Sequence, residues 1–229
     1  MTDAPAPETT PETTATGRRK SRGQKRNAAA TRQRILDVAM TEFAEHGYSG
    51  SRIDRIARSA DVNVGMIYHY FGNKDDLYIA ALEATYKVIR DREQTLQVNE
   101  ADPIQAMRQL IEMTFDFLST DPHFVRIIMN ENLMMGGMAK RSATIPNMTR
   151  PLLNSLRTIL KRGQSEDLFH KDTDAENFYI SILGLSFVHV SNRYTLNTMF
   201  QRDFADPVWL EKRKAVVTDI LITYLTSPG

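Results

Sequence analysis

The chain has 229 residues, with 29 basic and 28 acidic side chains, 41% apolar residues and no cysteine. This composition is typical of one or two ordinary globular domains, and the absence of cysteine excludes a disulfide scaffold, a cysteine-ligated metal site and thiol catalysis. The longest uncharged stretch, 177–192, has 16 residues, fewer than the roughly 18 apolar residues that a membrane-spanning helix needs. We therefore expect no membrane partner, no signal peptide and a cytoplasmic location.

Charge is unevenly distributed along the chain. Residues 1–17 carry a net charge of −3, and residues 18–34 carry +8. A basic segment beside a mildly acidic body is typical of a chain that binds a polyanion through one end, although a solubilising tail would have the same composition. The first 17 residues, rich in Thr, Pro and Ala, are expected to be disordered. Residues 1–30 are thus predicted to be a disordered tail with a basic arm of Arg18, Arg19, Lys20, Arg22, Lys25 and Arg26.

The spacing of apolar residues predicts an all-α fold. From residue 31 onward they recur every three or four positions, without the alternation typical of strands. Asp-Pro pairs at 102–103, 121–122 and 206–207 indicate helix starts, because aspartate caps a helix and proline fits its first turn. Ser51 with Asp54, Asn73 with Asp76, and Thr173 with Glu176 have capping-box spacing. About nine helices are expected, at 31–46, 52–60, 64–71, 74–95, 103–119, 122–135, 146–165, 174–201 and 207–226.

The first three predicted helices form a small unit. The second and third are joined by a tight turn through residues 60–63, and two short helices across such a turn, braced by a third, are the layout of a helix-turn-helix DNA reader. On a helical wheel, Ile67, Tyr70 and Phe71 share one side of the third helix. The other side carries the predicted groove-facing residues Val64, Gly65, Met66, Tyr68 and His69. A generic three-helix bundle is the alternative.

The stretch from Ser51 to Leu77 resembles the DNA-binding domain of the tetracycline-repressor (TetR) family. The likeness covers about residues 31–80 and depends on an ordered set of Val, Gly, Ile, Tyr, Tyr-Phe, Asn-Lys and Leu. Two positions depart from the family pattern, with Asp61 in place of the usual Gly and Asn63 in place of the usual Ser. The resemblance implies a helix-turn-helix DNA-binding domain at 31–74 and a helical ligand-binding and dimerisation domain at 75–229.

The DNA contacts that the resemblance implies agree with the chemistry of the residues. Lys74 lies in the first turn of a helix, where the helix dipole disfavours a cation, so a phosphate contact explains its position better than helix stability does. Tyr68 and His69 can donate hydrogen bonds to phosphates or base edges. Gly65 either allows close approach of the backbone to DNA or packs against the first helix. The predicted DNA-binding residues are Ser51, Arg52, Val64, Gly65, Met66, Tyr68, His69 and Lys74.

Residues 75–229 are expected to sense a small molecule. Glu131 lies within an apolar stripe of one predicted helix, and His189 and Arg193 lie within an apolar stripe of another. Acid and base could converge in an apolar pocket, or Glu131 could form a structural pair with either base. The arginines and His189 weakly favour an anionic or aromatic ligand. The predicted ligand-binding residues are Phe124, Ile127, Ile128, Glu131, Met135, Phe178, Ile182, Leu185, His189 and Arg193.

The predicted helices 174–201 and 207–226 carry more apolar surface than one protomer core would bury. Pairing them with their copies in a four-helix bundle would cover the excess, and the resemblance implies the same homodimer on a quasi-palindromic operator. The predicted dimer-interface residues are Tyr179, Leu183, Val190, Tyr194, Val217, Leu221 and Tyr224.

The sequence contains no motif of a metal, nucleotide or hydrolase active site, so no enzymatic activity, catalytic residue, metal or cofactor is expected. The resulting hypothesis is a homodimeric transcriptional regulator that a small-molecule effector releases from its operator. Of the two kinds of regulator, a repressor is favoured over an activator. Two alternatives remain: a nonspecific architectural DNA-binding protein, and a ligand-binding helical protein without a specific operator.

Overall fold

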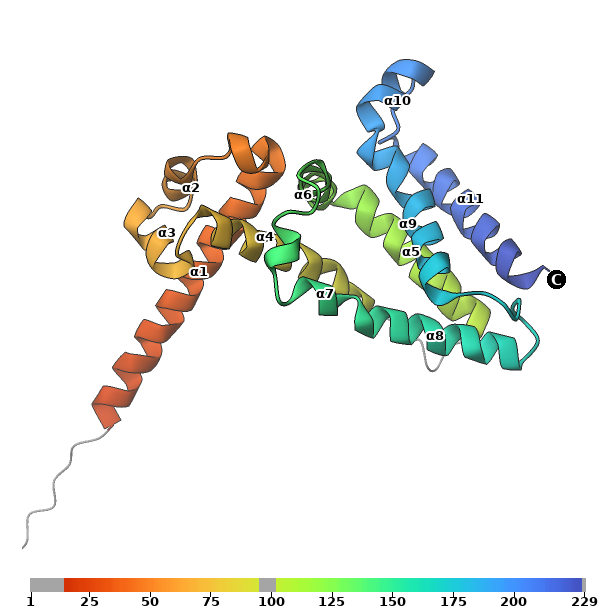
Figure 1. Cartoon of the computed structure of the whole chain (residues 1–229), viewed down its shortest axis with the longest axis horizontal. Helices are drawn as coiled ribbons and strands as arrows, with labels where there is room; N and C mark the ends of the chain where they lie inside the picture. Colours follow the sequence, from red (N-terminus) through yellow and green to blue (C-terminus); the bar gives the residue numbers. More distant parts are fainter. Residues whose placement is uncertain (1–14, 95–101, 228–229) are drawn as a thin grey trace, which may run out of the picture.

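The computed structural model describes residues 15–94 and 102–227, with side chains from residue 27 onward. In these ranges the protein is all-helical, without a strand, as predicted (Figure 1). The helices in chain order are α1 (Ala15–Gly50), α2 (Ile53–Ser59), α3 (Val64–Phe71), α4 (Lys74–Glu93), α5 (Pro103–Thr120), α6 (Pro122–Leu133), the 3₁₀ helix η1 (Ala139–Arg141), α7 (Ile145–Met148), α8 (Arg150–Ser165), α9 (Ala175–Ser191), α10 (Arg193–Phe200) and α11 (Pro207–Thr226).

Helices α1, α2 and α3 form a small unit with the first half of α4. Its core contains Ile35, Phe43, Ile56, Ile67 and Leu77, each fully buried. The middle of α1 also braces the turn of the unit, because Arg34 Nε donates to the Ala60 carbonyl at 2.7 Å and the Arg32 guanidinium lies over the Phe71 ring at 4.6 Å. These two arginines of the basic segment therefore have structural partners.

Helix α1 begins at Ala15, so its predicted start at residue 31 is wrong, and residues 15–30 are helical rather than disordered. The physical reason is composition: Ala, Arg, Lys and Gln favour a helix, and no proline follows Pro11 in this region. Residues 1–14 and the side chains of the predicted basic arm lie outside the described part of the chain. The predicted break after residue 46 is present, because Gly47 kinks the helix with φ 66° and ψ 177°.

The second half of the chain packs around α5. Its core joins α5, α8, α9 and α11 through Leu110, Phe115, Leu156, Ile182 and Leu221. Figure 1 shows α9 and α11 side by side above α5, with α8 running beneath them. Helix α6 lies between the two halves: Ile127 is buried in the N-terminal core, and Asn130 Nδ2 donates to the Phe43 carbonyl at 3.3 Å.

Two predicted helices are divided in the structure. The segment 174–201 breaks at Asn192 into α9 and α10, and the cap of α9 is Asp174 rather than Thr173, because the Asp174 carboxylate accepts the Asn177 N–H. The segment 146–165 is divided into α7 and α8, each with a proline in its first turn, where the missing N–H cannot extend a preceding helix. The aspartate caps at 102, 121 and 206 are confirmed.

Candidate nucleic-acid interface and ligand cavity

The turn between α2 and α3 is held by local hydrogen bonds. Asn63 caps α3 by accepting the Met66 N–H at 2.9 Å. Asp61 has φ 51°, a left-handed conformation that favours glycine and that aspartate tolerates; this explains why a glycine is usual there. A Cβ at Gly65 would lie 3.2 Å from Asn63 Oδ1, so this glycine leaves room for the cap and does not pack against α1.

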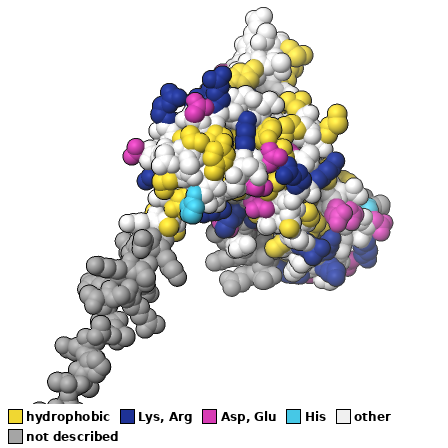
Figure 2. Space-filling view, turned by 60° about the vertical axis from the view of Figure 1, so that its left-hand side comes forward, with side chains coloured by type: hydrophobic (Ala, Val, Ile, Leu, Met, Phe, Trp, Pro, Cys, Tyr) yellow, Lys and Arg dark blue, Asp and Glu magenta, His cyan; other side chains and the backbone are white. Residues whose placement is uncertain are grey.

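One side of α3 is open to solvent. Val64, Gly65, Tyr68 and His69 are exposed, Tyr68 to 47%, and Met66 is half-buried. Ile67 and Phe71 are buried on the opposite side. Figure 2, in which this end of the molecule comes forward, shows Lys and Arg side chains scattered between apolar ones on the exposed face. Exposed donors on a short rigid helix are the chemistry that base and phosphate contacts require.

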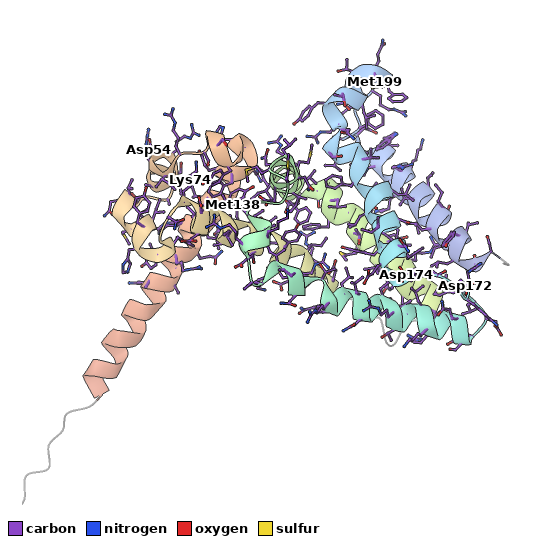
Figure 3. All side chains as sticks on the ribbon, in the orientation of Figure 1. Asp54, Lys74, Met138, Asp172, Asp174 and Met199 are labelled. Atoms are coloured by element: carbon purple, nitrogen blue, oxygen red, sulfur yellow. The ribbon has the colours of Figure 1, made fainter. Side chains whose placement is uncertain are left out.

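Ser51 and Lys74 lie behind this side rather than on it. Ser51 is 4% exposed and its hydroxyl donates to the Tyr48 carbonyl at 2.8 Å, so the predicted role of this hydroxyl in phosphate binding is wrong. Lys74 donates to the Ser51 carbonyl at 2.8 Å and lies over the Tyr48 ring; Figure 3 shows it within the N-terminal unit. Partial burial lowers the pKa of Lys74. Two of its three N–H donors are not used by this bond.

The start of α2 is fixed by an acid that the sequence analysis missed. Glu42 of α1 accepts hydrogen bonds from the Arg52 N–H at 2.9 Å and from Arg55 Nη2 at 2.6 Å. These bonds lower the pKa of Glu42 against the effect of its burial, and they replace the side-chain cap that Ser51 was predicted to supply. The signal was available, because Glu42 lies beside Phe43 on the buried stripe of α1.

Glu131 does not meet His189 or Arg193. Its Oε1 accepts the N–H groups of Met138 and Ala139 at 2.9 and 2.8 Å, just beyond the end of α6. Glu131 is 4% exposed and therefore anchors this loop. Both predictions for Glu131, a ligand site shared with the two bases and a structural pair with either, are wrong because α6 turns this side chain toward α4 and η1.

His189 and Arg193 have separate surroundings. His189 Nε2 lies 3.0 Å from the Ser119 hydroxyl, and its ring stacks on Phe115 at 4.8 Å. Burial, with a smaller effect from Arg213, lowers the pKa of His189 to about 4. Arg193 donates to the exposed Tyr194 hydroxyl. His189 is thus a neutral core residue, and Arg193 is half-buried at the start of α10.

An apolar cavity of about 400 Å³ opens between α4, α6 and α9. Of the ten predicted ligand residues, Phe124 and Ile128 line it. Ile127, Phe178, Ile182 and Leu185 belong to the cores, and Met135 is 85% exposed. The lining residues are Tyr86, Ile89, Arg90, Leu118, Phe124, Ile128, Asn132, Thr149, Tyr179, Ile180, Leu183, Gly184 and Phe187.

Arg90 and Tyr179 are bonded to each other in the lining of this cavity. Arg90 Nη2 donates to the Tyr179 hydroxyl at 2.9 Å, and Arg90 Nη1 lies 3.0 Å from Glu93 Oε2. Burial raises the pKa of Glu93 to about 7, against the effect of Arg90. This group was not among the predicted ligand residues, although Arg90 shares a helix stripe with Leu82 and Tyr86, the same signal that singled out Glu131.

The predicted dimer stripe of α9 faces inward. Tyr179 is 6% exposed and Leu183 lines the cavity, so these two predicted interface residues are wrong. Val190 packs against α6, and Tyr194 accepts a hydrogen bond from Arg126 at 2.8 Å. Val217 and Leu221 of α11 are buried in the protomer core, whereas Tyr224 is exposed. The apolar residues that remain exposed on α9 and α11 are Ile180, Val188, Val208, Val216, Ile220 and Tyr224.

Two negative observations bound the chemistry of the described residues. They contain no helix long and apolar enough to cross a membrane. No group of three or more His, Asp or Glu side chains among them is arranged to hold a metal ion.

Two family models match the chain. The model for the N-terminal domain of bacterial regulatory proteins of the tetR family matches residues 35–81, and the model for the tetracyclin repressor-like C-terminal domain matches residues 103–221. The two matches correspond to the α1–α4 unit and to most of the helices packed around α5.

Individual relatives agree with these matches. The chain is 36% identical over 188 residues to the HTH-type transcriptional repressor NicS of Pseudomonas putida, covering 82% of this chain and 89% of NicS. It is 35% identical over 111 residues to the repressor SCO4008 of Streptomyces coelicolor, covering 48% of this chain and 54% of that relative.

Solved structures show the same fold. A TetR transcriptional regulator from Chloroflexus aurantiacus superposes with a TM-score of 0.67 at 16% identity, covering 87% of this chain and 98% of that one. FadR from Bacillus subtilis, in complex with stearoyl-CoA, superposes with a TM-score of 0.64 at 22% identity, covering 84% of this chain and 98% of FadR.

Proposed function

Because this chain belongs to the TetR family of bacterial transcriptional regulators, we propose that it is a homodimeric repressor that binds a specific operator through α3 and leaves it when an effector binds the cavity between α4, α6 and α9. It then acts in the cytoplasm, where the chromosome is, and has no catalytic role. The ligand-bound FadR structure is a precedent for an effector in this fold.

The observation that carries this proposal is the position of α4. Its first residue, Lys74, is bonded to the carbonyl that precedes α2, and Arg90, sixteen positions further along the same helix, lines the cavity. At 1.5 Å per residue these two points are about 24 Å apart on one rigid element. A ligand that displaces the cavity end of α4 therefore also displaces the unit that carries α3.

This coupling is a shift between two populations. The effector binds a dimer with wrongly spaced α3 helices more tightly than it binds the operator-competent dimer. The ratio of these two effector affinities sets the largest factor by which the effector can lower operator affinity. The two α3 helices of a competent dimer must be about one DNA turn apart, roughly 34–36 Å. A small rotation of each α4 is then enough to break the fit to both half-sites.

We place the dimer interface on the outer sides of α9 and α11 in place of the inward-facing stripe. Val188 of α9 and Val216, Ile220 and Tyr224 of α11 are exposed. Two helices from each protomer would form a four-helix bundle that buries these apolar side chains.

The DNA-binding function is tested by enrichment of duplexes from a random pool at physiological salt. A two-fold symmetric consensus bound on the order of 10³ more tightly than scrambled DNA is expected. Tyr68→Ala should weaken binding to this consensus without lowering the melting temperature, whereas Tyr194→Ala, a matched change on exposed α10, should leave it unchanged. Salt-sensitive binding without enrichment would instead identify an architectural DNA-binding protein.

The dimer is tested by light scattering during size-exclusion chromatography. Ile220→Glu should convert the dimer to a folded monomer, because the exposed Ile220 contributes little to the protomer core. Leu133→Glu, at another exposed apolar residue at the end of α6, should leave the dimer intact. A dimer that survives the Ile220 substitution would refute this interface.

A further inference from the structure

The cavity between α4, α6 and α9 has an apolar wall with one cation at its end. Ile89, Phe124, Ile128, Leu183 and Phe187 form much of the wall. Arg90 is 11% exposed, and its guanidinium is a cation with five N–H donors. A buried cation needs hydrogen-bond acceptors around it, since desolvating unpaired donors costs free energy.

The acceptors around Arg90 do not satisfy it. Its Nη2 donates to the Tyr179 hydroxyl, but Nε and Nη1 have no hydrogen-bond acceptor among the residues that the structure describes. Glu93 is close, yet the 3.0 Å contact from Nη1 lacks hydrogen-bond geometry, and both Glu93 oxygens are buried without a donor in the described chain. Both unpaired nitrogens are buried, but Arg90 itself lines the apolar cavity, so a shift of the guanidinium would present its unpaired donors to a ligand there.

We propose that the effector is an organic acid, whose carboxylate binds Arg90 and whose apolar body occupies the cavity. This inference rests on the proposed function, since it names the chemical class that the effector site accepts. A carboxylate can accept two parallel hydrogen bonds from one guanidinium. The Tyr179 hydroxyl lies within 2.9 Å of the same guanidinium and can donate to the carboxylate.

Other ligand classes fit less well. A neutral apolar molecule fills the cavity but leaves the Arg90 donors unpaired, and a cation is repelled by the guanidinium. The volume of about 400 Å³ lies near the lower end of the range for small-molecule pockets. An acid with an aromatic or short aliphatic body matches both the volume and the charge.

The test compares acids with amides of the same carbon skeleton, which differ in charge but hardly in shape. Benzoate, 2-naphthoate and octanoate are each paired with the corresponding primary amide, and binding to the full chain is measured by calorimetry without DNA. At least one acid is expected to bind about tenfold or more tightly than its amide, the contribution of a charge-assisted hydrogen bond.

Variants locate the head group. Arg90→Gln should abolish the preference for the acid, and Arg90→Lys should restore part of it. Arg157→Gln makes the same change at an exposed arginine of α8 that does not line the cavity and should bind like wild type. Glu93→Gln keeps Arg90 and removes a competing carboxylate, so it should tighten acid binding even if the Arg90 variants fold poorly.

Three outcomes would overturn the proposal: amides that bind as tightly as acids, an acid preference that persists in Arg90→Gln, or no binding of any of the six compounds at millimolar concentration. Operator release is measured separately with the enriched duplex. Acid binding at Arg90 without operator release would refute the regulatory function and leave the acid site intact. Operator release by a neutral compound would refute the acid site and leave the regulatory function intact.

Discussion

Arg141 of η1 donates a hydrogen bond to Asp75 in the first turn of α4, with Nη1 2.6 Å from Oδ2. The other carboxylate oxygen of Asp75 accepts a hydrogen bond from the Tyr48 hydroxyl of α1. The hydrogen bond from Tyr48 lowers the pKa of Asp75 most, and the hydrogen bond from Arg141 lowers it further. One carboxylate thus joins the DNA-binding unit to the loop that Glu131 anchors beyond α6, in the region where Figure 3 shows Met138.

Arg141→Gln should weaken the coupling between the cavity and the operator. Both partners are partly exposed, and such ion pairs contribute little to stability, so the melting temperature should hardly change. The ratio of operator affinities with and without effector should fall toward one, because the loop loses its bond to the first turn of α4 and is left with the one from Ser142 to Glu83. Titrating labelled operator at saturating effector measures this ratio. Arg157→Gln is the control, and an unchanged ratio in Arg141→Gln would exclude this contact from the coupling.

Asp61→Asn should raise operator affinity severalfold. Asparagine tolerates the left-handed backbone at φ 51° as well as aspartate does, so the turn should keep its conformation and its stability. The substitution removes a negative charge beside α3, the helix that we propose faces DNA, and hence its repulsion of phosphates. Affinity measured at several salt concentrations should show the gain shrinking as salt rises. Asp219→Asn on α11 should show no gain, and equal gains in both variants would point to a change in net charge alone.

His189 should make folding sensitive to acid. The pKa of His189 is about 4 when folded, against 6.5 for a free side chain, so the unfolded chain binds the proton more readily. The stability that depends on neutral His189 is complete above pH 6.5 and is lost as the pH falls toward 4, by at most about 3 kcal/mol. His189→Gln should flatten the pH dependence of denaturant unfolding in this range. His123→Gln, at an exposed histidine, should retain the wild-type slope; if both variants retain it, the loss arises elsewhere.

Gly163→Ala should destabilise the protein. A Cβ at this buried position of α8 would lie 2.1 Å from Phe169 Cδ2, and such overpacking typically costs about 1–3 kcal/mol. The expected result is a lower denaturant midpoint with an unchanged slope. Gly50→Ala, whose Cβ would meet only His46 Cβ at an ordinary 3.6 Å, should stay close to wild type. A wild-type midpoint for Gly163→Ala would show that Phe169 can move aside.

Features that depend on neighbours in sequence could be predicted without the structure. Asn73 caps its helix as expected, and Ile67 and Phe71 are buried on the expected side of α3. Helix caps and helix faces depend on residues three and four positions apart, so the sequence itself specifies them. The resemblance to a family extended this local information to the unit that carries α3.

Features that depend on neighbours in space could not be predicted. The spacing in α9 revealed two apolar stripes, but it did not show that Tyr179 faces the cavity and His189 faces Phe115. The sequence likewise did not show the bonding partners of Glu131 or the position of Arg90 beside the cavity, because both depend on how distant segments pack. The sequence by itself therefore determined the all-helical fold, the aspartate and asparagine caps that it predicted and the exposed side of α3, because these depend on local hydrogen bonds and spacing. Only the tertiary structure decided which helix faces meet, because that depends on how side chains distant in the chain pack together.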